Sequence, residues 1–335
     1  MDRIKNKTIF ISALDWGLGH ATRCVPLIKQ LMQDNVVILG ITPITALIFN
    51  EEFPSLKKVN VEPYNIRYSH TTPLSVKLLL DASRILRVVK KERLQLQKII
   101  KEYQIDVVIS DNRFGMYEKS VHCIYITHQL NIQAGLFSEI ANKVHHHFIK
   151  QFNEVWVPDF EEDNKSLAGK LSRNIIHQNV KYIGTLSRLS IVDKSENQYD
   201  YLCLISGPEP LRNDLEKALI KKANQSDKRI CFVRGTTKEL KSFINKNVIV
   251  FDMPPAKELS QLILNATTII CRSGYSTLMD LQHLQKKNYI FVPTPGQDEQ
   301  EYLAKYWNEK FEAKVVRQKD LNAFSFNYQF TITVS

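Results

Sequence analysis

Short apolar runs rich in β-branched residues alternate with longer helical patterns along the whole chain. This alternation is typical of α/β folds, because each strand of a parallel sheet is followed by a crossover helix before the next strand. It therefore predicts parallel, doubly wound sheets. A first series of strands is expected at Thr8–Ala13, Val36–Ile41, Val107–Ser110, Ile124–Thr127, Val155–Pro158 and Tyr182–Gly184.

A second series follows the polar stretch 187–200, which is the best candidate for a linker. The 335 residues exceed the size at which one hydrophobic core usually stops growing, so two domains are expected. The layout predicts two Rossmann-like domains, 1–186 and 201–335, facing each other across a cleft. The strands of the second series are expected at Tyr201–Ser206, Ile230–Arg234, Val248–Phe251, Thr268–Cys271 and Ile290–Pro293.

The composition, 44% apolar and 24% charged, is that of a soluble globular protein. The N-terminal residues lack the long apolar segment of a signal peptide, which predicts a cytoplasmic protein. No cysteine pair has C-x-x-C spacing and most cysteines adjoin apolar runs, so buried thiols are favoured over disulfides or zinc ligands. The cysteines are Cys24, Cys123, Cys203, Cys231 and Cys271.

The net charge of +10 favours anionic partners, but it is spread over both halves and no nucleic-acid-binding motif accompanies it. We therefore expect no nucleic acid as a partner. A long helix is predicted at Leu78–Gln104, and between Arg84 and Lys101 its basic residues are accompanied by one acid, Glu92. This pattern indicates either a solvated helix face or a peripheral contact with an anionic membrane.

The first strand ends in a loop that contains Gly17, Gly19 and His20 before a helix begins. Glycines allow a sharp turn at the carboxyl end of the strand, where open α/β sheets bind ligands. The loop is not the dinucleotide fingerprint, because Thr22 stands where the third glycine would be. His20 has an unperturbed pKa near neutrality and is the candidate base for an acceptor hydroxyl, with a purely structural turn as the alternative.

Two further polar groups follow predicted strands of the first half. Asp111 is expected at the same sheet edge as His20, as a second base or as the group that orients His20. His128 is a candidate contact for the acceptor or a phosphate. Capping and packing roles are the alternatives for both. The triplet His145–His147 does not predict a metal site, since successive helical residues point about 100° apart.

In the second half, the strand ending at Cys271 runs into a turn and a helix start that could cradle a diphosphate. Asp280 lies four residues after Ser276, on the same helical face, where its carboxylate could bind a ribose diol. A capped helix with a solvated Asp280 is the structural alternative. The candidate donor-binding residues are Ser206, Gly207, Arg272, Ser273, Gly274, Ser276, Thr277, Asp280, Gln300 and Glu301.

Two of these segments, Arg-Ser-Gly-x-Ser-Thr from Arg272 and Pro-x-Pro-Gly-Gln-x-Glu-Gln from Pro293, resemble the donor half of a known enzyme family. It is the glycosyltransferase family 28-like group, which includes the bacterial enzyme that adds N-acetylglucosamine to lipid-linked peptidoglycan precursor. The Gly17–His20 loop resembles that family's acceptor-side glycine loop. By this resemblance Asp280 stands where a ribose-binding glutamate is usual, and Gln300 and Glu301 where the sugar-facing pair lies.

The resemblance implies a GT-B fold and an inverting transfer of a hexose or N-acetylhexosamine from a nucleotide sugar, UDP-linked by preference. The acceptor is a hydroxyl, such as that of a lipid-linked or cell-surface polysaccharide precursor. No cofactor and no metal ion are expected, because helix N-termini and hydroxyls can stabilise the diphosphate. Alternatives are a UDP-sugar 2-epimerase and a nucleotide-sugar-binding protein without turnover. A nicotinamide dehydrogenase is disfavoured by the incomplete dinucleotide fingerprint.

Overall fold

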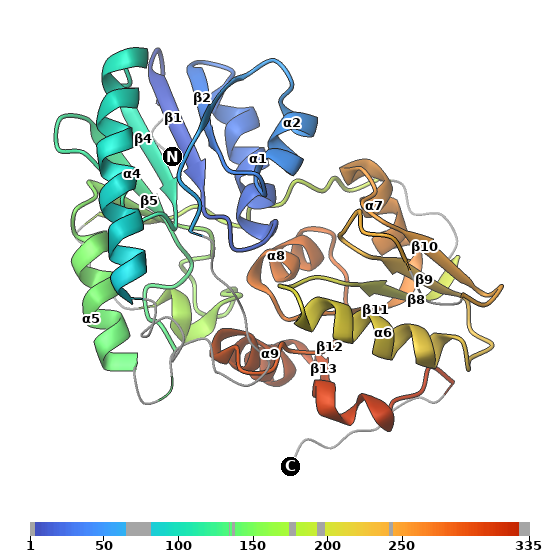
Figure 1. The fold of residues 1–335 in the computed structure, drawn as a ribbon. Helices are drawn as coiled ribbons and strands as arrows, with labels where there is room; N and C mark the ends of the chain where they lie inside the picture. Colours follow the sequence, from blue (N-terminus) through green and yellow to red (C-terminus); the bar gives the residue numbers. More distant parts are fainter. Residues whose placement is uncertain are drawn as a thin grey trace. The chain divides into compact units, whose positions relative to one another are not determined.

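The computed structural model of the chain describes residues 4–64, 82–133, 135, 138–173, 179–192, 198–240 and 244–327. The described residues divide into two compact units, one ending at Arg188 and one beginning at Leu189. Each unit is an α/β domain built on its own parallel sheet (Figure 1).

The described part of the first domain contains a seven-stranded sheet in the order β3-β2-β1-β4-β5-β6-β7, and every pairing is parallel. This is the doubly wound arrangement, in which the strand order reverses between β1 and β4. Its strands are β1 (Thr8–Ala13), β2 (Val36–Ile41), β3 (Lys57–Asn60), β4 (Val107–Asp111), β5 (His122–Ile126), β6 (Glu154–Val157) and β7 (Val180–Tyr182).

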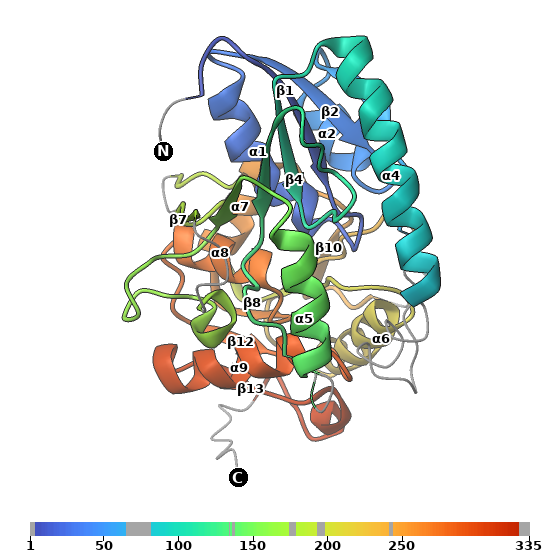
Figure 2. The same cartoon turned by 90° about the vertical axis from the view of Figure 1, so that its left-hand side faces the viewer.

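Side chains alternate between the two faces of β1, and each face has its own core. Ile9 and Ile11 pack with the helices α1 (Gly19–Leu31) and α2 (Ala46–Glu52). Phe10 packs on the opposite face with side chains of α4 (Ala82–Tyr103) and α5 (Ser138–Ile149). Figure 2 shows α4 and α5 on the same side of the sheet as each other. Helices on both faces explain why β1 and β4 are buried on both of their faces.

The second domain contains a six-stranded parallel sheet in the order β10-β9-β8-β11-β12-β13. The helix α6 (Leu211–Ala223) and the short helix η3 (Gln318–Asn322) cover one face. The further helices are α7 (Ala256–Leu264), α8 (Tyr275–His283) and α9 (Asp298–Phe311). The strands are β8 (Tyr199–Leu204), β9 (Ile230–Val233), β10 (Val248–Phe251), β11 (Ala266–Cys271), β12 (Tyr289–Phe291) and β13 (Lys314–Val315).

The predicted fold class of two Rossmann-like α/β domains is confirmed. Strands β1, β2 and β10 have the predicted bounds, and the other predicted strands shift by a few residues. The first unit ends inside the expected linker 187–200, of which 193–197 lie outside the described residues, and β8 begins at Tyr199. Of the predicted helix Leu78–Gln104, the structure describes α4 from Ala82, and 78–81 lie outside the described residues.

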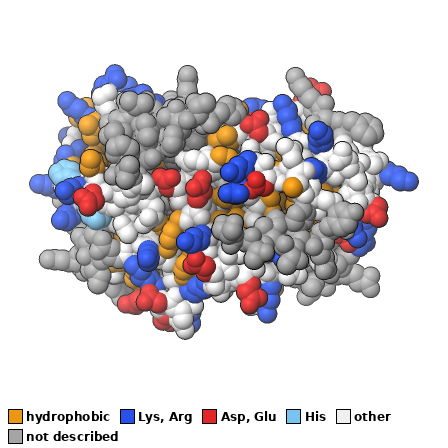
Figure 3. Space-filling model, turned by 90° about the horizontal axis from the view of Figure 1, so that it is seen from below, with side chains coloured by type: hydrophobic (Ala, Val, Ile, Leu, Met, Phe, Trp, Pro, Cys, Tyr) orange, Lys and Arg blue, Asp and Glu red, His pale blue; other side chains and the backbone are white. Residues whose placement is uncertain are grey.

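All five cysteines are buried free thiols, as their positions in apolar runs indicated. Within the described part of the chain, no helix has the length and apolar character needed to cross a bilayer. On the face drawn in Figure 3, acidic and basic side chains are interspersed.

Candidate active site

The reversal of strand order fixes where each domain can bind a ligand. In open α/β sheets the binding crevice lies beyond the carboxyl ends of the two strands at the reversal. In the first sheet these are β1 and β4, which pair with Ala13 opposite Asp111. In the second they are β8 and β11, which pair with Leu204 opposite Cys271. The loops after these four strands contain most of the candidate residues.

In the first domain, His20 and Asp111 are in contact. His20 lies in the first turn of α1, and its Nδ1 is 2.8 Å from Oδ1 of Asp111, at the end of β4. The Asp111 side chain is completely buried, whereas that of His20 keeps 16% of its surface exposed. Among the described residues, no hydrogen bond involves Nε2 of His20. The imidazole is therefore oriented by the carboxylate and retains a second nitrogen for chemistry.

A third residue, Arg23, completes this cluster and was not predicted from the sequence. It follows His20 by three positions, on the same side of α1, and its guanidinium is buried. Its Nε donates to Asp111 Oδ2 over 2.6 Å, and a terminal nitrogen donates to Asp111 Oδ1. Its other terminal nitrogen lies 3.3 Å from Nδ1 of His128, which follows β5. Arg23 thus contacts His128 directly and reaches His20 through the Asp111 carboxylate.

The surroundings set the charges of this cluster. Burial would raise the pKa of Asp111, but the charges and hydrogen bonds of Arg23 and His20 hold it well below its usual value. Burial lowers the pKa of His20 and the Arg23 charge lowers it further, while Asp111 offsets part of the effect. At neutral pH the cluster therefore contains an ionised carboxylate, a charged guanidinium and a neutral His20, which is the protonation state that a general base needs.

The histidine triplet supports the loop that carries His128. His145 Nε2 lies 2.8 Å from the carbonyl oxygen of Gln129, and His146 Nε2 lies 3.0 Å from that of Leu130. His147 is exposed. The imidazoles of His145 and His146 therefore contact two adjacent carbonyls, and both anchor the chain after β5 to α5.

In the second domain, α8 begins at the loop after β11. Gly274 is its N-cap residue, with space around its Cα on the side where a Cβ would lie. Ser276, Thr277 and Asp280 lie on the partly exposed side of α8, while Leu278 is buried. The predicted common face of Ser276 and Asp280 is thus present in the structure.

Arg272 lies inside this domain rather than on its surface. Its two terminal nitrogens donate to the carbonyl oxygens of Val292, Pro293 and Leu211 and to Gln318 Oε1, over 2.7–3.0 Å. Burial lowers the pKa of Arg272 to about 10, with partial compensation by Asp214, so it remains charged at neutral pH. The guanidinium connects the ends of β11 and β12 to the start of α6.

The other predicted donor residues differ in exposure. Ser206, Gly207 and Glu301 are exposed. The Ser273 hydroxyl is buried and donates to the Gln300 carbonyl over 2.7 Å. The Gln300 side chain is turned into its own loop, where it accepts from the Thr294 N–H over 3.0 Å and donates to Gln297 Oε1 over 2.6 Å. Ser273 and Gln300 therefore hold the loops after β11 and β12 together.

Residues 207–330 match the model of the glycosyltransferase family 28 C-terminal domain. The second domain therefore contains a glycosyltransferase domain of this family, and the chain is a glycosyltransferase. A search of curated proteins finds no match to the sequence.

Solved structures give the glycosyltransferase its fold type. It is similar to the spinosyn rhamnosyltransferase SpnG, with a TM-score of 0.66 and 12% identity, over 94% of this chain and 89% of SpnG. It is also similar to Acinetobacter baumannii MurG, with a TM-score of 0.55 and 14% identity, over 93% of this chain and 86% of MurG. Both likenesses show the GT-B fold that the sequence motifs implied.

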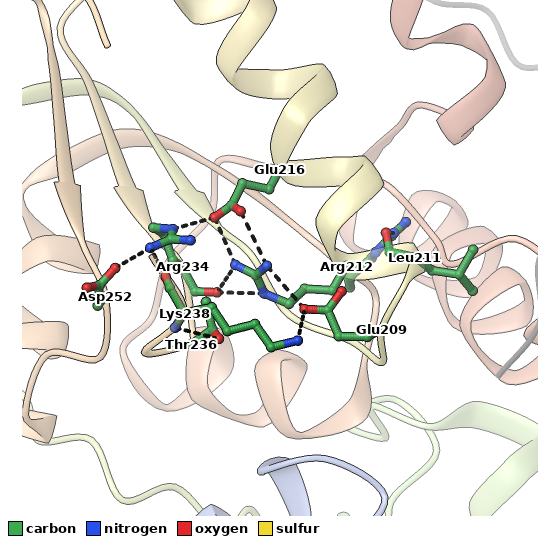
Figure 4. Close-up of polar contacts among 9 residues, drawn as sticks. Glu209, Leu211, Arg212, Glu216, Arg234, Thr236, Lys238 and Asp252 are labelled. Carbon is green, nitrogen blue, oxygen red and sulfur yellow. Dashed lines mark hydrogen bonds and ion pairs between the residues drawn. The ribbon is translucent and has the colours of Figure 1, made fainter. Parts of the chain in front are cut away.

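The glycosyltransferase also contains a buried ionic cluster beneath the loops after β8 and β9, drawn in Figure 4. Glu216 of α6 accepts from Arg212 over 2.8 Å and from Arg234 over 2.6 Å, and Arg234 also donates to Asp252 over 2.6 Å. The Arg234 carbonyl oxygen accepts from the Arg212 side chain. The cluster fixes the start of α6, and hence the loop containing Gly207, against the end of β9.

Two buried polar residues of the second domain, Arg234 and Thr294, were not predicted from the sequence to belong to the site. Arg234 follows β9, so its place at a strand end was a signal that could have been used. Thr294 is completely buried, and its Oγ1 has no hydrogen-bond partner among the described residues. A Cβ on Gly207 would lie 3.8 Å from that hydroxyl. Nothing in the sequence near Thr294 distinguishes it from an ordinary turn residue.

Proposed function

We propose that this glycosyltransferase is an inverting enzyme that moves a hexose or N-acetylhexosamine from a nucleotide sugar to a hydroxyl acceptor. The observation that carries the proposal is the contact between His20 and Asp111 at the strand-order reversal of the first sheet. A neutral imidazole oriented through Nδ1 by an ionised carboxylate can accept a proton at Nε2.

The proposed reaction is a single displacement. The acceptor hydroxyl gives its proton to His20 Nε2, and its oxygen forms a bond to the anomeric carbon as the bond from that carbon to the diphosphate oxygen breaks. The electron pair of the broken bond leaves with the nucleoside diphosphate. One displacement on the opposite face inverts the configuration. Asp111 stabilises the imidazolium that forms, and its four hydrogen-bond contacts leave it an orienting group rather than a second base.

The donor diphosphate is proposed to bind at the start of α8. Helix N-termini present N–H groups and a positive dipole to anions. The first turn of α8 contains no acidic residue, whereas α6 has Asp214 and α9 has Asp298, Glu299 and Glu301 in their first turns. Ser276 and Thr277 would add hydroxyl donors, with Ser206 and Gly207 from the loop after β8.

The nucleotide is proposed to extend along α8 toward Asp280, whose carboxylate would accept from the ribose hydroxyls. The structural relative SpnG is also described in complex with thymidine diphosphate. This supports a nucleoside diphosphate as the leaving group here, with a UDP-sugar as the proposed donor. Glu301 would contact sugar hydroxyls, while Arg272, Ser273 and Gln300 would act by holding the surrounding loops.

Helix α4 supports a peripheral contact with an anionic membrane, and hence a lipid-linked acceptor. Its one acidic residue between Arg84 and Lys101, Glu92, is buried against Arg113 and Tyr64. The charged residues on the outer side of α4 are therefore all basic over this span, and two exposed leucines lie among them. The exposed residues are Leu86, Arg87, Lys90, Lys91, Leu94, Lys98 and Lys101.

A nucleotide-sugar screen followed by product analysis tests the proposed function. UDP-, GDP- and dTDP-sugars are first compared by thermal shift, and the best ligand is labelled in the sugar and incubated with hydroxyl acceptors. Transfer releases the nucleoside diphosphate and labels the acceptor with inverted configuration. Isomerised nucleotide sugar without release would instead establish an epimerase. Binding without any turnover across lipid and polysaccharide acceptors would favour a binding protein.

A further inference from the structure

The buried Arg23–Asp111 pair requires different hydrogen-bonding roles of the Nδ1 atoms of the two imidazoles beside it. Asp111 is ionised and can only accept hydrogen bonds, so the neutral His20 ring must carry its proton on Nδ1, 2.8 Å from Oδ1. Arginine can only donate, so His128 must offer a lone pair at Nδ1, 3.3 Å from the guanidinium. A neutral His128 therefore carries its proton on Nε2.

The contacts around Asp111 leave it little freedom to change this pattern. Oδ1 accepts from His20 and Arg23, and Oδ2 accepts from Arg23 and from the Cys24 thiol at 3.3 Å. Two contacts on each oxygen occupy the hydrogen-bonding capacity of a carboxylate. The carboxylate side chain is completely buried, so no water competes for these positions.

We propose that Arg23 is a positioning residue that, through Asp111 and His128, holds His20 and His128 in opposite tautomers. His20 then presents a proton-accepting Nε2, and His128 is a hydrogen-bond donor at Nε2 and cannot act as the base there. The catalytic consequence rests on the proposed function, in which His20 receives the acceptor proton. The tautomers themselves follow from the contacts and do not depend on the reaction.

The charges that face His20 come from three elements. Arg23 lies on α1, Asp111 ends β4, and His128 follows β5. Protonating His20 would place a second positive charge beside the buried guanidinium. Arg23 therefore favours the neutral base, while its pairing with Asp111 keeps the carboxylate available to orient the ring.

Nitrogen-15 NMR of the full chain labelled in histidine tests the tautomers directly, because protonated and unprotonated ring nitrogens resonate far apart. His20→Gln and His128→Gln spectra assign the signals. We expect His20 protonated at Nδ1 and His128 at Nε2 near neutral pH. The same tautomer in both rings, or His128 protonated at Nδ1, would overturn the proposal without any variant of Arg23.

Arg23→Lys then tests the positioning role. Lysine keeps the charge but has one nitrogen, which cannot reach both Asp111 oxygens and His128 at once. The retained charge should keep Asp111 ionised and the His20 tautomer unchanged, while His128 becomes a mixture. Because Asp111 loses one of its two contacts to Arg23, it should orient His20 less firmly, and kcat should fall by ~10-fold or more with the nucleotide-sugar KM nearly unchanged. Arg229→Lys, an exposed arginine before β9, is the matched control. An unchanged His128 tautomer in Arg23→Lys would refute the positioning role.

The two claims fail separately. If His20→Ala retains full activity while the wild-type tautomers are as stated, the base assignment in the proposed function is wrong and the tautomer proposal stands. If His20→Ala is inactive but both rings show the same tautomer, the proposal for Arg23 is wrong and the base assignment stands.

Discussion

Nδ1 of His20 lies 2.8 Å from Oδ1 of Asp111, although 91 positions separate the two residues in the sequence. The contact exists because β1 and β4 are neighbours in the sheet, so the loops that follow them meet at one edge. It orients the His20 imidazole, which is the proposed base, through one ring nitrogen.

Replacing His20 by alanine should lower turnover far more than donor binding. A positioned general base typically contributes roughly 10² to 10⁴ in rate, so kcat should fall by that range, with the Kd for the nucleotide sugar within about twofold. Steady-state kinetics and calorimetry measure the two quantities. His147→Ala, an exposed histidine on α5, is the control. Undiminished turnover in His20→Ala would transfer the role to another group.

Replacing Asp280 should weaken nucleotide binding. Charge-assisted hydrogen bonds contribute roughly 1.5 to 3 kcal/mol, so Asp280→Ala should raise the Kd for UDP about ten- to a hundred-fold. The Kd of Asp280→Asn should lie between those of the wild type and Asp280→Ala. Calorimetric titration decides the matter. Asp227→Ala, an exposed carboxylate before β9, is the matched control. Equal binding by all variants, or no binding of UDP by the wild type, would show that the ribose is held elsewhere.

Chelation should leave activity largely intact. The proposed diphosphate site uses the N-terminus of α8 and nearby hydroxyls rather than a divalent cation. Initial rates with and without EDTA, at saturating nucleotide sugar, measure this. Complete loss of activity that Mg²⁺ or Mn²⁺ restores would refute this model of the donor site.

Stability should fall as the pH drops from about 6.5 toward 4. Burial lowers the pKa of His145 from 6.5 to about 4, so between these values the unfolded chain binds a proton at this site that the folded chain does not. The free energy of unfolding therefore decreases as pH falls, by roughly 1 to 2 kcal/mol at pH 5 from this residue.

Denaturant unfolding at pH 7 and pH 5 checks this contribution by difference. His145→Gln, which keeps a donor for the Gln129 carbonyl, should lose less stability over the interval than the wild type. His147→Gln should behave as the wild type does. Identical pH dependence in all three proteins would show that His145 titrates normally in the folded state.

Binding to anionic vesicles should depend on α4. Exposed charges are screened within about 8 Å at physiological ionic strength, so sedimentation with the vesicles should weaken as salt is added. Arg87→Glu combined with Lys90→Glu should reduce binding, while Lys217→Glu combined with Lys221→Glu on α6 should not. Equal binding to neutral vesicles would argue against this contact.

Strands were predicted most accurately from the sequence where a continuous apolar run marks them. The apolar runs of β1, β2 and β10 gave their bounds directly. Strands β3 (Lys57–Asn60) and β13 (Lys314–Val315) were missed because they are short, polar edge strands without an apolar run. Their existence depends on a neighbouring strand rather than on their own residues.

The candidate site residues were likewise only partly predictable from the sequence. The loops with Gly17, His20 and Gly274 could be located because glycine and polar residues follow predicted strands. The direction in which a long side chain points could not be predicted, because it depends on tertiary packing. Arg272 follows a predicted strand, as a phosphate-binding arginine would, yet its side chain points into the domain. Arg23 has the sequence context of an ordinary charged helix residue, although its side chain is buried against Asp111.

Among the described residues, each domain has hydrophobic core clusters of its own. Every side chain in the cores around the first sheet comes from residue 183 or earlier, and every side chain in the core around α6 comes from residue 201 or later. A crossover between those positions in a chimaera with another GT-B enzyme would leave each core with all its own side chains. Under the proposed function, in which the first domain binds the acceptor and the second the donor, the two preferences could then change independently, by exchange of whole domains as well as by point substitution.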